Sequence, residues 1–186
     1  MERKENEILP GKDRKVILYI AASLDGFIAG EDGDIDWLSS VEKPGEDYGY
    51  SEFIASVDTV ILGRKTYDKV LSFGIPYPHS DKQCYVITRS YRPSHDSITF
   101  FRDDVKTLIG RLKSESGKNI FVDGGAEIVQ LMQKDSLIDE YIVSIIPILL
   151  GKGIRLFKDA HIRKDLQLVS CRSFDTGLVQ MHYRSK

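Results

Sequence analysis

The sequence has few cysteines, no long apolar run and no excess of charge of either sign. Cys84 and Cys171 are its only cysteines, which excludes the disulfide framework of a small secreted protein and leads us to expect a reducing, cytoplasmic location. The longest apolar stretch, residues 145–150, is far shorter than the ~20 residues that a membrane-spanning helix needs. Residues 1–15 are charged and polar, unlike the apolar core of a signal peptide. We therefore expect no membrane segment.

The charge balance and the length narrow the choice further. The chain has 28 acidic and 26 basic side chains and a formal net charge of −2, so no bulk electrostatic attraction to nucleic acid is expected. Its 186 residues correspond to one domain that is large enough to bury a core. We expect residues 1–14, in which charges are mixed with Pro10 and Gly11, to form a flexible tail and residues 15–186 to form a single domain. The expected partner is a small molecule.

Motifs for metal, nucleotide and nucleophile chemistry are also missing. No histidine stands at metal-ligand spacing from another histidine or from a cysteine. The chain has neither the glycine–lysine–serine/threonine loop of P-loop enzymes nor the glycine fingerprint of Rossmann folds. A Gly-x-Ser-x-Gly nucleophile elbow is absent as well. We therefore predict no metal site and a redox cofactor that carries the chemistry.

Apolar runs and helical spacings predict an α/β fold. Near-continuous apolar runs predict buried strands at residues 16–22, 58–62, 83–88, 98–101, 119–122 and 138–150. Apolar side chains three and four residues apart predict helices at residues 46–57, 66–73, 105–112 and 127–134, and residues 23–37 read as a glycine-rich loop. Residues 166–174 and 178–184 flank Asp175-Thr176-Gly177, the pattern of a β-hairpin. The expected architecture is a mixed, mostly parallel central sheet with helices on both faces and a C-terminal antiparallel hairpin.

Three of the predicted strands end in residues that suit a bound anion, at the edge where ligands bind in open α/β sheets. Residues 63–66 (Gly-Arg-Lys-Thr) and 123–126 (Asp-Gly-Gly-Ala) each lead into a helix, whose first N–H groups attract negative charge. Residues 88–90 (Thr-Arg-Ser) offer two hydroxyls and a guanidinium. Singly, these segments are also explained as a capped helix, a tight turn and a polar loop. Together they predict a phosphate-rich ligand such as a dinucleotide.

The segments that carry these patterns resemble the dihydrofolate-reductase-like fold. They are AASLDGFIAGEDGDIDW from Ala21, LGRKTY from Leu62 and VDGGAE from Val122. The resemblance is closer to the C-terminal reductase domain of the bifunctional riboflavin-biosynthesis deaminase/reductase and to its stand-alone relatives. PILLGKGIRLF, residues 147–157, is typical of that riboflavin branch.

The resemblance implies NADPH as the cofactor. It places two residues beside the nicotinamide, Ala22 and Ile28. Two groups would surround the phosphates: Gly63, Arg64, Lys65 and Thr66, and Gly124, Gly125, Ala126 and Glu127. Thr88, Arg89 and Ser90 would bind the adenosine 2′-phosphate together with Arg64. The family often carries a non-proline cis peptide bond in this glycine turn, which would fall at or beside the Asp123–Gly124 bond.

Two acidic residues are candidates for the chemistry. Asp47 stands sixteen residues before Gly63, the spacing of the acid in dihydrofolate reductases. The alternative for Asp47 is an exposed acid at the start of a helix. Asp25 resembles a residue typical of the riboflavin branch that contacts substrate, and its alternative is one half of an Asp-Gly turn. A reduction needs a proton as well as a hydride, so an acid beside the acceptor is expected.

Two departures argue against a folate substrate. Ser51 stands where folate enzymes carry an aromatic ring, and no arginine lies between Lys65 and Thr88 to pair with a glutamyl carboxylate. The resemblance thus implies an NADPH-dependent reductase of 5-amino-6-(5-phosphoribosylamino)uracil or a similar pyrimidine. A dihydrofolate reductase proper and a non-catalytic dinucleotide-binding protein are the alternatives. The resemblance also implies a homodimer, with residues 142–150 either at its interface or in the core.

Overall fold

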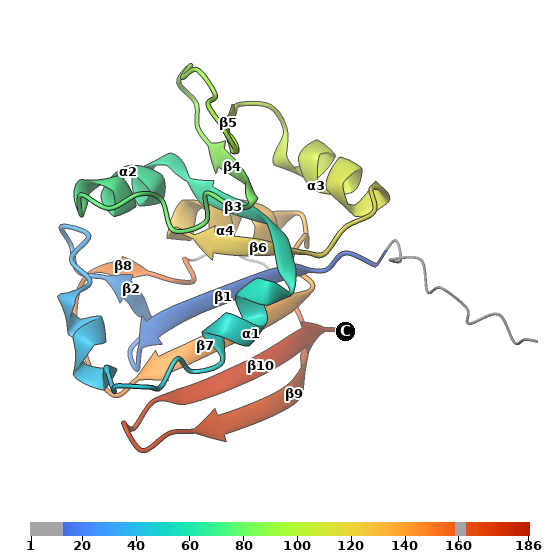
Figure 1. The fold of residues 1–186 in the computed structure, drawn as a ribbon. Helices are drawn as coiled ribbons and strands as arrows, with labels where there is room; N and C mark the ends of the chain where they lie inside the picture. Colours follow the sequence, from blue (N-terminus) through green and yellow to red (C-terminus); the bar gives the residue numbers. More distant parts are fainter. Residues whose placement is uncertain (1–12, 159–162) are drawn as a thin grey trace, which may run out of the picture.

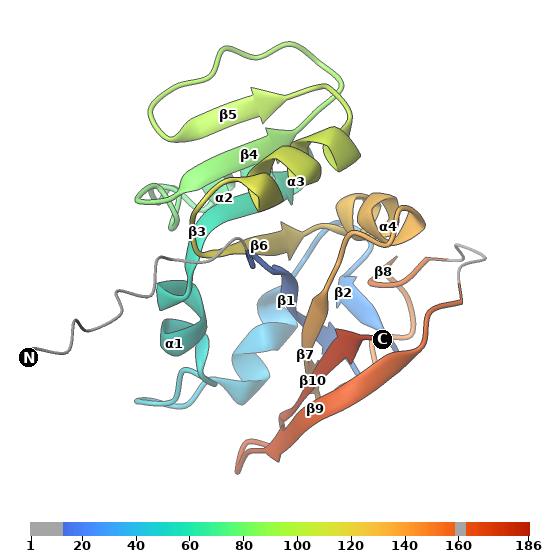
Figure 2. The same cartoon turned by 90° about the vertical axis from the view of Figure 1, so that its right-hand side faces the viewer.

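The computed structural model describes residues 13–158 and 163–186, and its centre is one eight-stranded sheet (Figure 1). The strand order is β5-β4-β3-β6-β1-β7-β10-β9, so β5 and β9 are the two edges (Figure 2). The strands are β1 (Val16–Ser23), β3 (Val57–Gly63), β4 (Gln83–Ile87), β5 (Ile98–Phe101), β6 (Asn119–Gly124), β7 (Glu140–Ile146), β9 (Leu166–Ser173) and β10 (Val179–Ser185). β10 runs antiparallel to β7 and β9, and all other neighbours in this sheet are parallel. The mostly parallel sheet with a C-terminal hairpin is confirmed.

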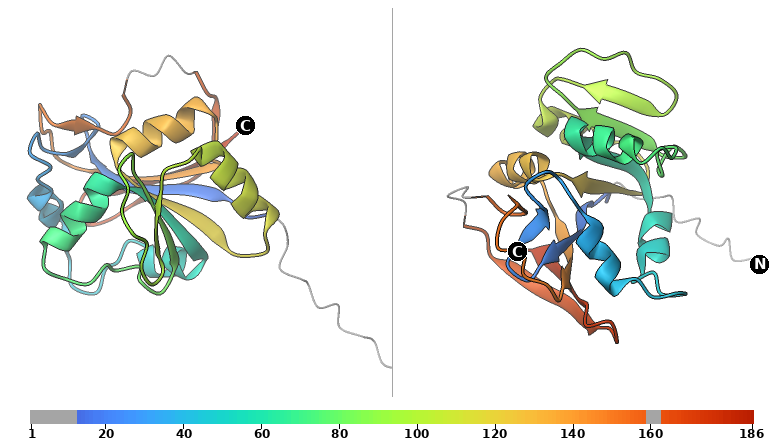
Figure 3. Two further views of the ribbon diagram at one scale, coloured as in Figure 1. Left: turned by 90° about the horizontal axis from the view of Figure 1, so that it is seen from above. Right: turned by 90° about the vertical axis from the view of Figure 1, so that its left-hand side faces the viewer.

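Helices cover both faces of this sheet, as expected (Figure 3). α1 (Tyr50–Ala55) and α2 (Arg64–Ser72) pack on one face through Phe53 and Tyr67. α3 (Val105–Ser114) and α4 (Ala126–Lys134) pack on the other face, where their apolar side chains join those of β1 and β6 in the larger core cluster. The central strands are apolar on both sides because both sides are covered.

The structure differs from the sequence-based expectation in the short elements and at several ends. β2 (Phe27–Ala29) and β8 (Ile154–Arg155) form a small antiparallel pair, and η1 (Asp36–Val41) is a 3₁₀ helix. β2 lies in the segment 23–37 that we expected to be a loop, and η1 begins at the end of that segment. All three elements are too short to produce a readable period. α1 begins only at Tyr50, because Gly49 before it has a φ of 81°. β7 ends at Ile146, before Pro147, which cannot donate to a sheet.

Arg14 belongs to the folded domain and not to the tail, which corrects the expected boundary. Its side chain is buried, and its guanidinium donates to the carbonyl oxygens of Lys118 (2.8 Å) and Leu112 (3.1 Å) and to the Asp58 carboxylate. These acceptors lie on α3, on the loop after it and on β3, so the contacts of the folded domain begin before Lys15. The rest of the expected tail, residues 1–12, lies outside the described residues.

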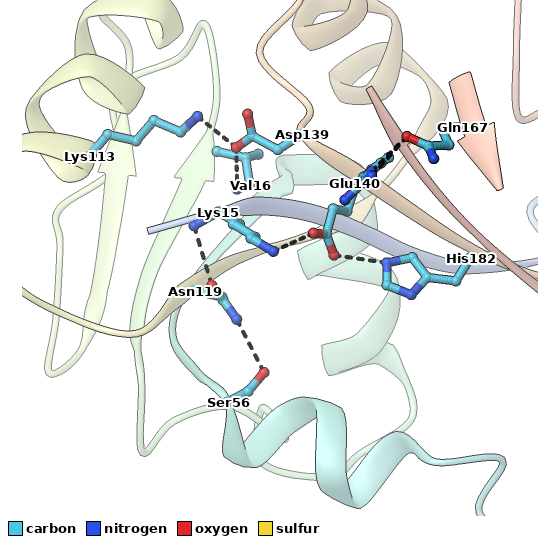
Figure 4. Close-up of polar contacts among 10 residues, drawn as sticks. Lys15, Val16, Ser56, Lys113, Asn119, Asp139, Glu140, Gln167 and His182 are labelled. Atoms are coloured by element: carbon cyan, nitrogen blue, oxygen red, sulfur yellow. Dashed lines mark hydrogen bonds and ion pairs between the residues drawn. The ribbon is translucent and has the colours of Figure 1, made fainter. Parts of the chain in front are cut away.

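Ion pairs and hydrogen bonds join the strands at the amino ends of β1 and β7, at the end of the sheet opposite the predicted ligand site (Figure 4). The Glu140 carboxylate, at the start of β7, accepts from Lys15 Nζ at 2.6 Å and lies 2.8 Å from His182 Nε2 on β10. Asp139 accepts from the Val16 N–H at 2.8 Å and pairs with Lys113 at 2.6 Å. This network fixes the amino ends of β1 and β7 relative to each other. Because the two strands are parallel, their carboxyl ends lie together at the opposite end of the sheet.

Candidate active site

The carboxyl ends of β3 and β6 bring two glycine turns into contact, and a helix starts from each turn. α2 follows Gly63 and α4 follows Gly125, and neither helix has a side-chain hydrogen bond at its N-cap. A Cβ atom added to Gly125 would lie 3.1 Å from Thr66 Oγ1, and one added to Gly63 would lie 3.8 Å from the Gly125 nitrogen. Two helix starts with uncapped N–H groups thus lie side by side, an arrangement that suits a pyrophosphate. The Gly124–Gly125 peptide bond is cis, beside the bond where it was expected.

Basic side chains surround these two turns. Lys65 Nζ lies 3.2 Å from Glu127 Oε1 and links the start of α2 to the start of α4. The hydrogen bond from Lys65 and the charges of Lys65 and Arg89 lower the pKa of Glu127. Arg64 pairs with Asp68 at 2.6 Å, one turn further along α2. The residues expected to hold the cofactor phosphates are therefore close together, and their charges fit an anionic ligand.

The remaining predicted cofactor residues lie around the same edge. Thr88 is buried just beyond β4, and its hydroxyl accepts from the Ser90 N–H at 3.1 Å. Ala22, near the end of β1, is buried in the larger core cluster, and Ile28 of β2 packs against that cluster. Both lie on the α3/α4 face of the sheet. Both expected nicotinamide contacts are apolar, but the Ala22 side chain is 1% exposed and is therefore enclosed by the core.

A cavity of about 680 Å³ lies beside this edge, on the α1 side of the sheet. Tyr19 and Ala21 of β1 contribute to its wall, together with the segment from Leu38 to Tyr50 and residues of β7. Ala21 and Ala22 are consecutive in β1, so their side chains point to opposite faces of the sheet: Ala21 lines the cavity, and Ala22 lies on the α3/α4 face. A cavity of this size holds a small-molecule ring system.

Asp47 lines this cavity as an ionised carboxylate. Its two oxygens accept from the N–H groups of Gly49 (2.9 Å) and Ser51 (3.0 Å), in the turn that leads into α1. Hydrogen bonds from Ser51 and from these N–H groups lower the pKa of Asp47. The position in the cavity agrees with the resemblance, whereas the contacts agree with the alternative of an acid that caps a helix start. A group with a lowered pKa carries no proton at neutral pH.

Asp25 does not line the cavity but joins two loops. Its carboxylate accepts from Ser23 Oγ (2.6 Å) and from the N–H groups of Leu150 (3.1 Å) and Gly151 (2.7 Å). The hydrogen bond from Ser23 and those from the backbone lower the pKa of Asp25 to about 2. These contacts link the turn after β1 to the segment between β7 and β8. They are the contacts of a positioning residue.

Asp123 is an acidic group that the sequence patterns did not single out. It is the fifth residue of β6 and shares the α1/α2 face with Phe121, one position before the glycine turn. Burial raises the pKa of its carboxyl group to about 6. Its charge in turn raises the pKa values of Tyr50, which lines the cavity, and of Tyr77, after burial as the main cause in both. The sequence pattern that could have identified Asp123 is an acidic residue two positions after Phe121, on the same face of an otherwise apolar strand.

The sequence itself matches a known family over almost its whole length. Residues 14–180 match the family model described as the RibD C-terminal domain. The chain belongs to the RibD C-terminal domain family.

Relatives of this RibD C-terminal domain cover most of the chain. YwjB of Bacillus subtilis, an uncharacterised protein, is 47% identical over 174 residues, which are 92% of this chain and 98% of YwjB. YyaP of the same organism, also uncharacterised, is 34% identical and covers 92% of this chain and 95% of its own length. A crystal structure from Shewanella sp. PV-4, described provisionally as a riboflavin biosynthesis protein, has a TM-score of 0.86 at 31% identity, with 92% and 99% coverage.

More distant solved structures share the fold of the RibD C-terminal domain. Acinetobacter baumannii RibD has a TM-score of 0.66 at 17% identity, and this chain spans 58% of its length. A pyrimidine reductase-like protein of Corynebacterium diphtheriae has a TM-score of 0.65 at 14% identity and is covered to 93%. The resemblance seen in the sequence is thus confirmed at the level of family and fold.

Two kinds of site are not found in the described residues. No group of three or more histidine, cysteine, aspartate or glutamate side chains there could hold a metal ion. In the same part of the chain, no helix is long and apolar enough to cross a membrane.

Proposed function

We propose that the chain is an NADPH-dependent reductase that acts on a small ring compound bound in the cavity beside β1. The observation that carries this proposal is the contact between two uncapped helix starts, with Lys65, Arg64 and Arg89 around them. That arrangement fits the pyrophosphate and the 2′-phosphate of a dinucleotide. The cavity beside β1 then holds the substrate on the α1 face of the sheet, where Ala21 lines it.

The residues divide the work of the reduction between them. The bound cofactor supplies a hydride, and Ala22 and Ile28 form an apolar surface that orients its ring. The glycine turns and their cations bind the phosphates. We assign the proton that must accompany the hydride to Asp123, which lies outside the cavity lining and is partly protonated near neutral pH because burial raises its pKa to about 6.

Asp47 has a different role from Asp123 because its environment has the opposite effect. Its lowered pKa keeps it ionised, so it accepts a hydrogen bond from an N–H group of the bound ring. Two carboxyl groups with pKa values shifted in opposite directions are typical of sites that need both a proton source and a fixed negative charge. The resemblance implies a pyrimidine as the ring, and an aminopyrimidine has the required N–H groups.

Thermal unfolding with NADPH and with NADH in parallel tests the cofactor. A ligand at 100 times its dissociation constant stabilises a protein by ~2.7 kcal/mol, which is ~5–11 °C for a domain of this size. We expect this increase with NADPH and a smaller one with NADH. Arg64→Ala and Arg89→Ala should remove the preference, whereas Arg111→Ala, on α3, should keep it.

Three outcomes would contradict the proposal. No increase in unfolding temperature with either nucleotide would exclude a dinucleotide site. An equal increase with NADH would exclude 2′-phosphate recognition by Arg64 and Arg89. If NADPH binds but is not oxidised with any of a set of carbonyl and imine compounds, the chain is a dinucleotide-binding protein without activity.

A further inference from the structure

The charges around the cavity point to a kind of substrate that differs from the one the resemblance implies. We propose that the cavity takes an uncharged or protonated planar ring and rejects a phosphate ester. This inference rests on the proposed function, because it concerns the substrate side of the same site. It follows from the charged lining, the aromatic lining and the place of the nearby cations.

The charged lining of the cavity is predominantly acidic. Glu42, Glu46 and Asp47 contribute three carboxylates, and Lys43 contributes the one cation among the described lining residues. Lys43 Nζ lies 3.1 Å from the Asp175 carboxylate, so a further acid stands beside the one cation of the lining. A phosphate dianion in this space would meet more carboxylates than cations, and like charges repel.

The acidic groups are held in place. Asp47 is fixed by the N–H groups of Gly49 and Ser51, which also lower its pKa. Glu46 Oε1 accepts from the Tyr48 N–H at 2.9 Å. These two carboxylates cannot swing away from an anion without loss of their hydrogen bonds, so the repulsion is built into the loop before α1.

Aromatic side chains also line the cavity: Tyr19, Tyr48 and Tyr50. The Tyr19 ring stacks on Phe53 with 4.5 Å between ring centroids and is crossed edge-on by Tyr50 at 5.5 Å. Gln180 Nε2 donates to Tyr19 Oη at 3.0 Å and fixes the hydroxyl. Aromatic faces together with carboxylates favour a planar ring, and a protonated ring more than a neutral one.

One cation next to the loop that lines the cavity, Arg172, is the main group that could bind a phosphate there. A terminal nitrogen of Arg172, on β9, lies 3.5 Å from where a Cβ of Gly49 would stand. Its guanidinium lies 5.1 Å from the centroid of the Phe174 ring, against which it packs. Arg172 is outside the cavity lining, but at Tyr19, whose pKa is raised mainly by burial, the charge of Arg172 acts against that of Asp47. The experiment therefore includes it.

Calorimetric titration of matched ligands into the protein saturated with NADP⁺ tests the inference. The bound cofactor keeps phosphate esters out of its own phosphate sites. Uridine and uridine 5′-monophosphate differ only by the phosphate, and we expect uridine to bind at least tenfold more tightly, with a gap that narrows at high salt. We expect 2,4-diaminopyrimidine, which takes up a proton, to bind more tightly than uracil. The double variant Glu42→Gln/Glu46→Gln should reduce both differences, whereas Glu115→Gln, on the surface near the end of α3, should not.

The opposite results would overturn the inference. Binding of uridine 5′-monophosphate as tight as that of uridine would show that the cavity accepts phosphate, and its loss in Arg172→Gln would assign the phosphate to Arg172. Failure of all four ligands to bind the NADP⁺-saturated protein would mean that the cavity does not take such rings. Failure of the proposed function is distinct, because NADPH would then give no increase in the unfolding temperature.

Discussion

Asp123→Asn should make the protein more stable at neutral pH while it harms the proposed chemistry. In the folded protein the pKa of Asp123 is raised from 3.8 to about 6 by burial. The folded state therefore holds this proton more tightly than the unfolded state does. Asp123 favours folding fully below pH 3.8, and this contribution is lost as the pH rises to about 6.

The size of this effect follows from the pKa difference. At 1.36 kcal/mol per pKa unit, the complete loss is up to about 3 kcal/mol, of which about 2 kcal/mol falls between pH 4.5 and pH 7.5. An asparagine cannot ionise and escapes this loss. The unfolding free energy of Asp123→Asn minus that of the wild type should therefore rise by about 2 kcal/mol between the two pH values, or ~4–8 °C in unfolding temperature.

Urea unfolding followed by the fluorescence of Trp37, the single tryptophan, measures this difference at both pH values. Any fixed cost of the new amide cancels because only the change with pH is used. Asp47→Asn is the control of opposite sign: the pKa of Asp47 is lowered, so its stabilisation is present at neutral pH and is lost on acidification. A gap between Asp123→Asn and the wild type that is the same at pH 4.5 and 7.5 would refute the buried, proton-holding Asp123.

Three further predictions concern other parts of the molecule. Gly125→Ala should weaken NADPH binding at least tenfold, because its Cβ would lie 3.1 Å from Thr66 Oγ1 between the two helix starts; titration calorimetry measures this, and unchanged affinity would contradict it. Asp25→Ala should speed hydrogen exchange at the Gly151 amide, because the hydrogen bond from this amide to the Asp25 carboxylate (the Asp25 clamp) is lost. The affinity for NADPH should not change, because the two glycine turns are kept. A Gly151 amide that stays protected in the variant would contradict the Asp25 clamp. Arg14→Gln should lower the unfolding free energy by ~2–3 kcal/mol, measured by urea unfolding, because a buried guanidinium and its ion pair are lost; an unchanged midpoint would return this residue to the tail.

Much of the fold was predictable because the central strands are continuous apolar runs. The long strands were found from the sequence, as was the hairpin around Asp175-Thr176-Gly177. The predicted ends of two elements were wrong because a single residue overrides the apolar pattern. Pro147 ends β7, and Gly49, with a φ of 81°, makes α1 begin later than predicted. β2 and β8 were missed because strands of two or three residues depend on a partner more than 120 residues away in the chain.

Only those parts of the candidate site that are formed by the backbone, the glycine turns, could be predicted from the sequence. Glycine turns at strand ends can be read from the sequence, and the structure brings two of them into contact. Asp123 was overlooked because its interest comes from burial and from Tyr50 and Tyr77, which are distant in the sequence. The contacts of Asp25 were hidden for the same reason, since its partners are main-chain amides 125 and 126 residues away.

The hydrogen bonds of Asp25 to the amides of residues 150 and 151 determine which substitutions the segment between β7 and β8 tolerates. Its carboxylate recognises the peptide N–H of Leu150 and not the leucine side chain. Nearly every amino acid other than proline offers that same N–H group, so position 150 can be substituted widely while the two loops remain joined. Position 25 has no such freedom, because the acceptor is a side chain of one length and charge. An engineer who wishes to reshape the segment between β7 and β8 can therefore vary position 150 and should leave Asp25 alone.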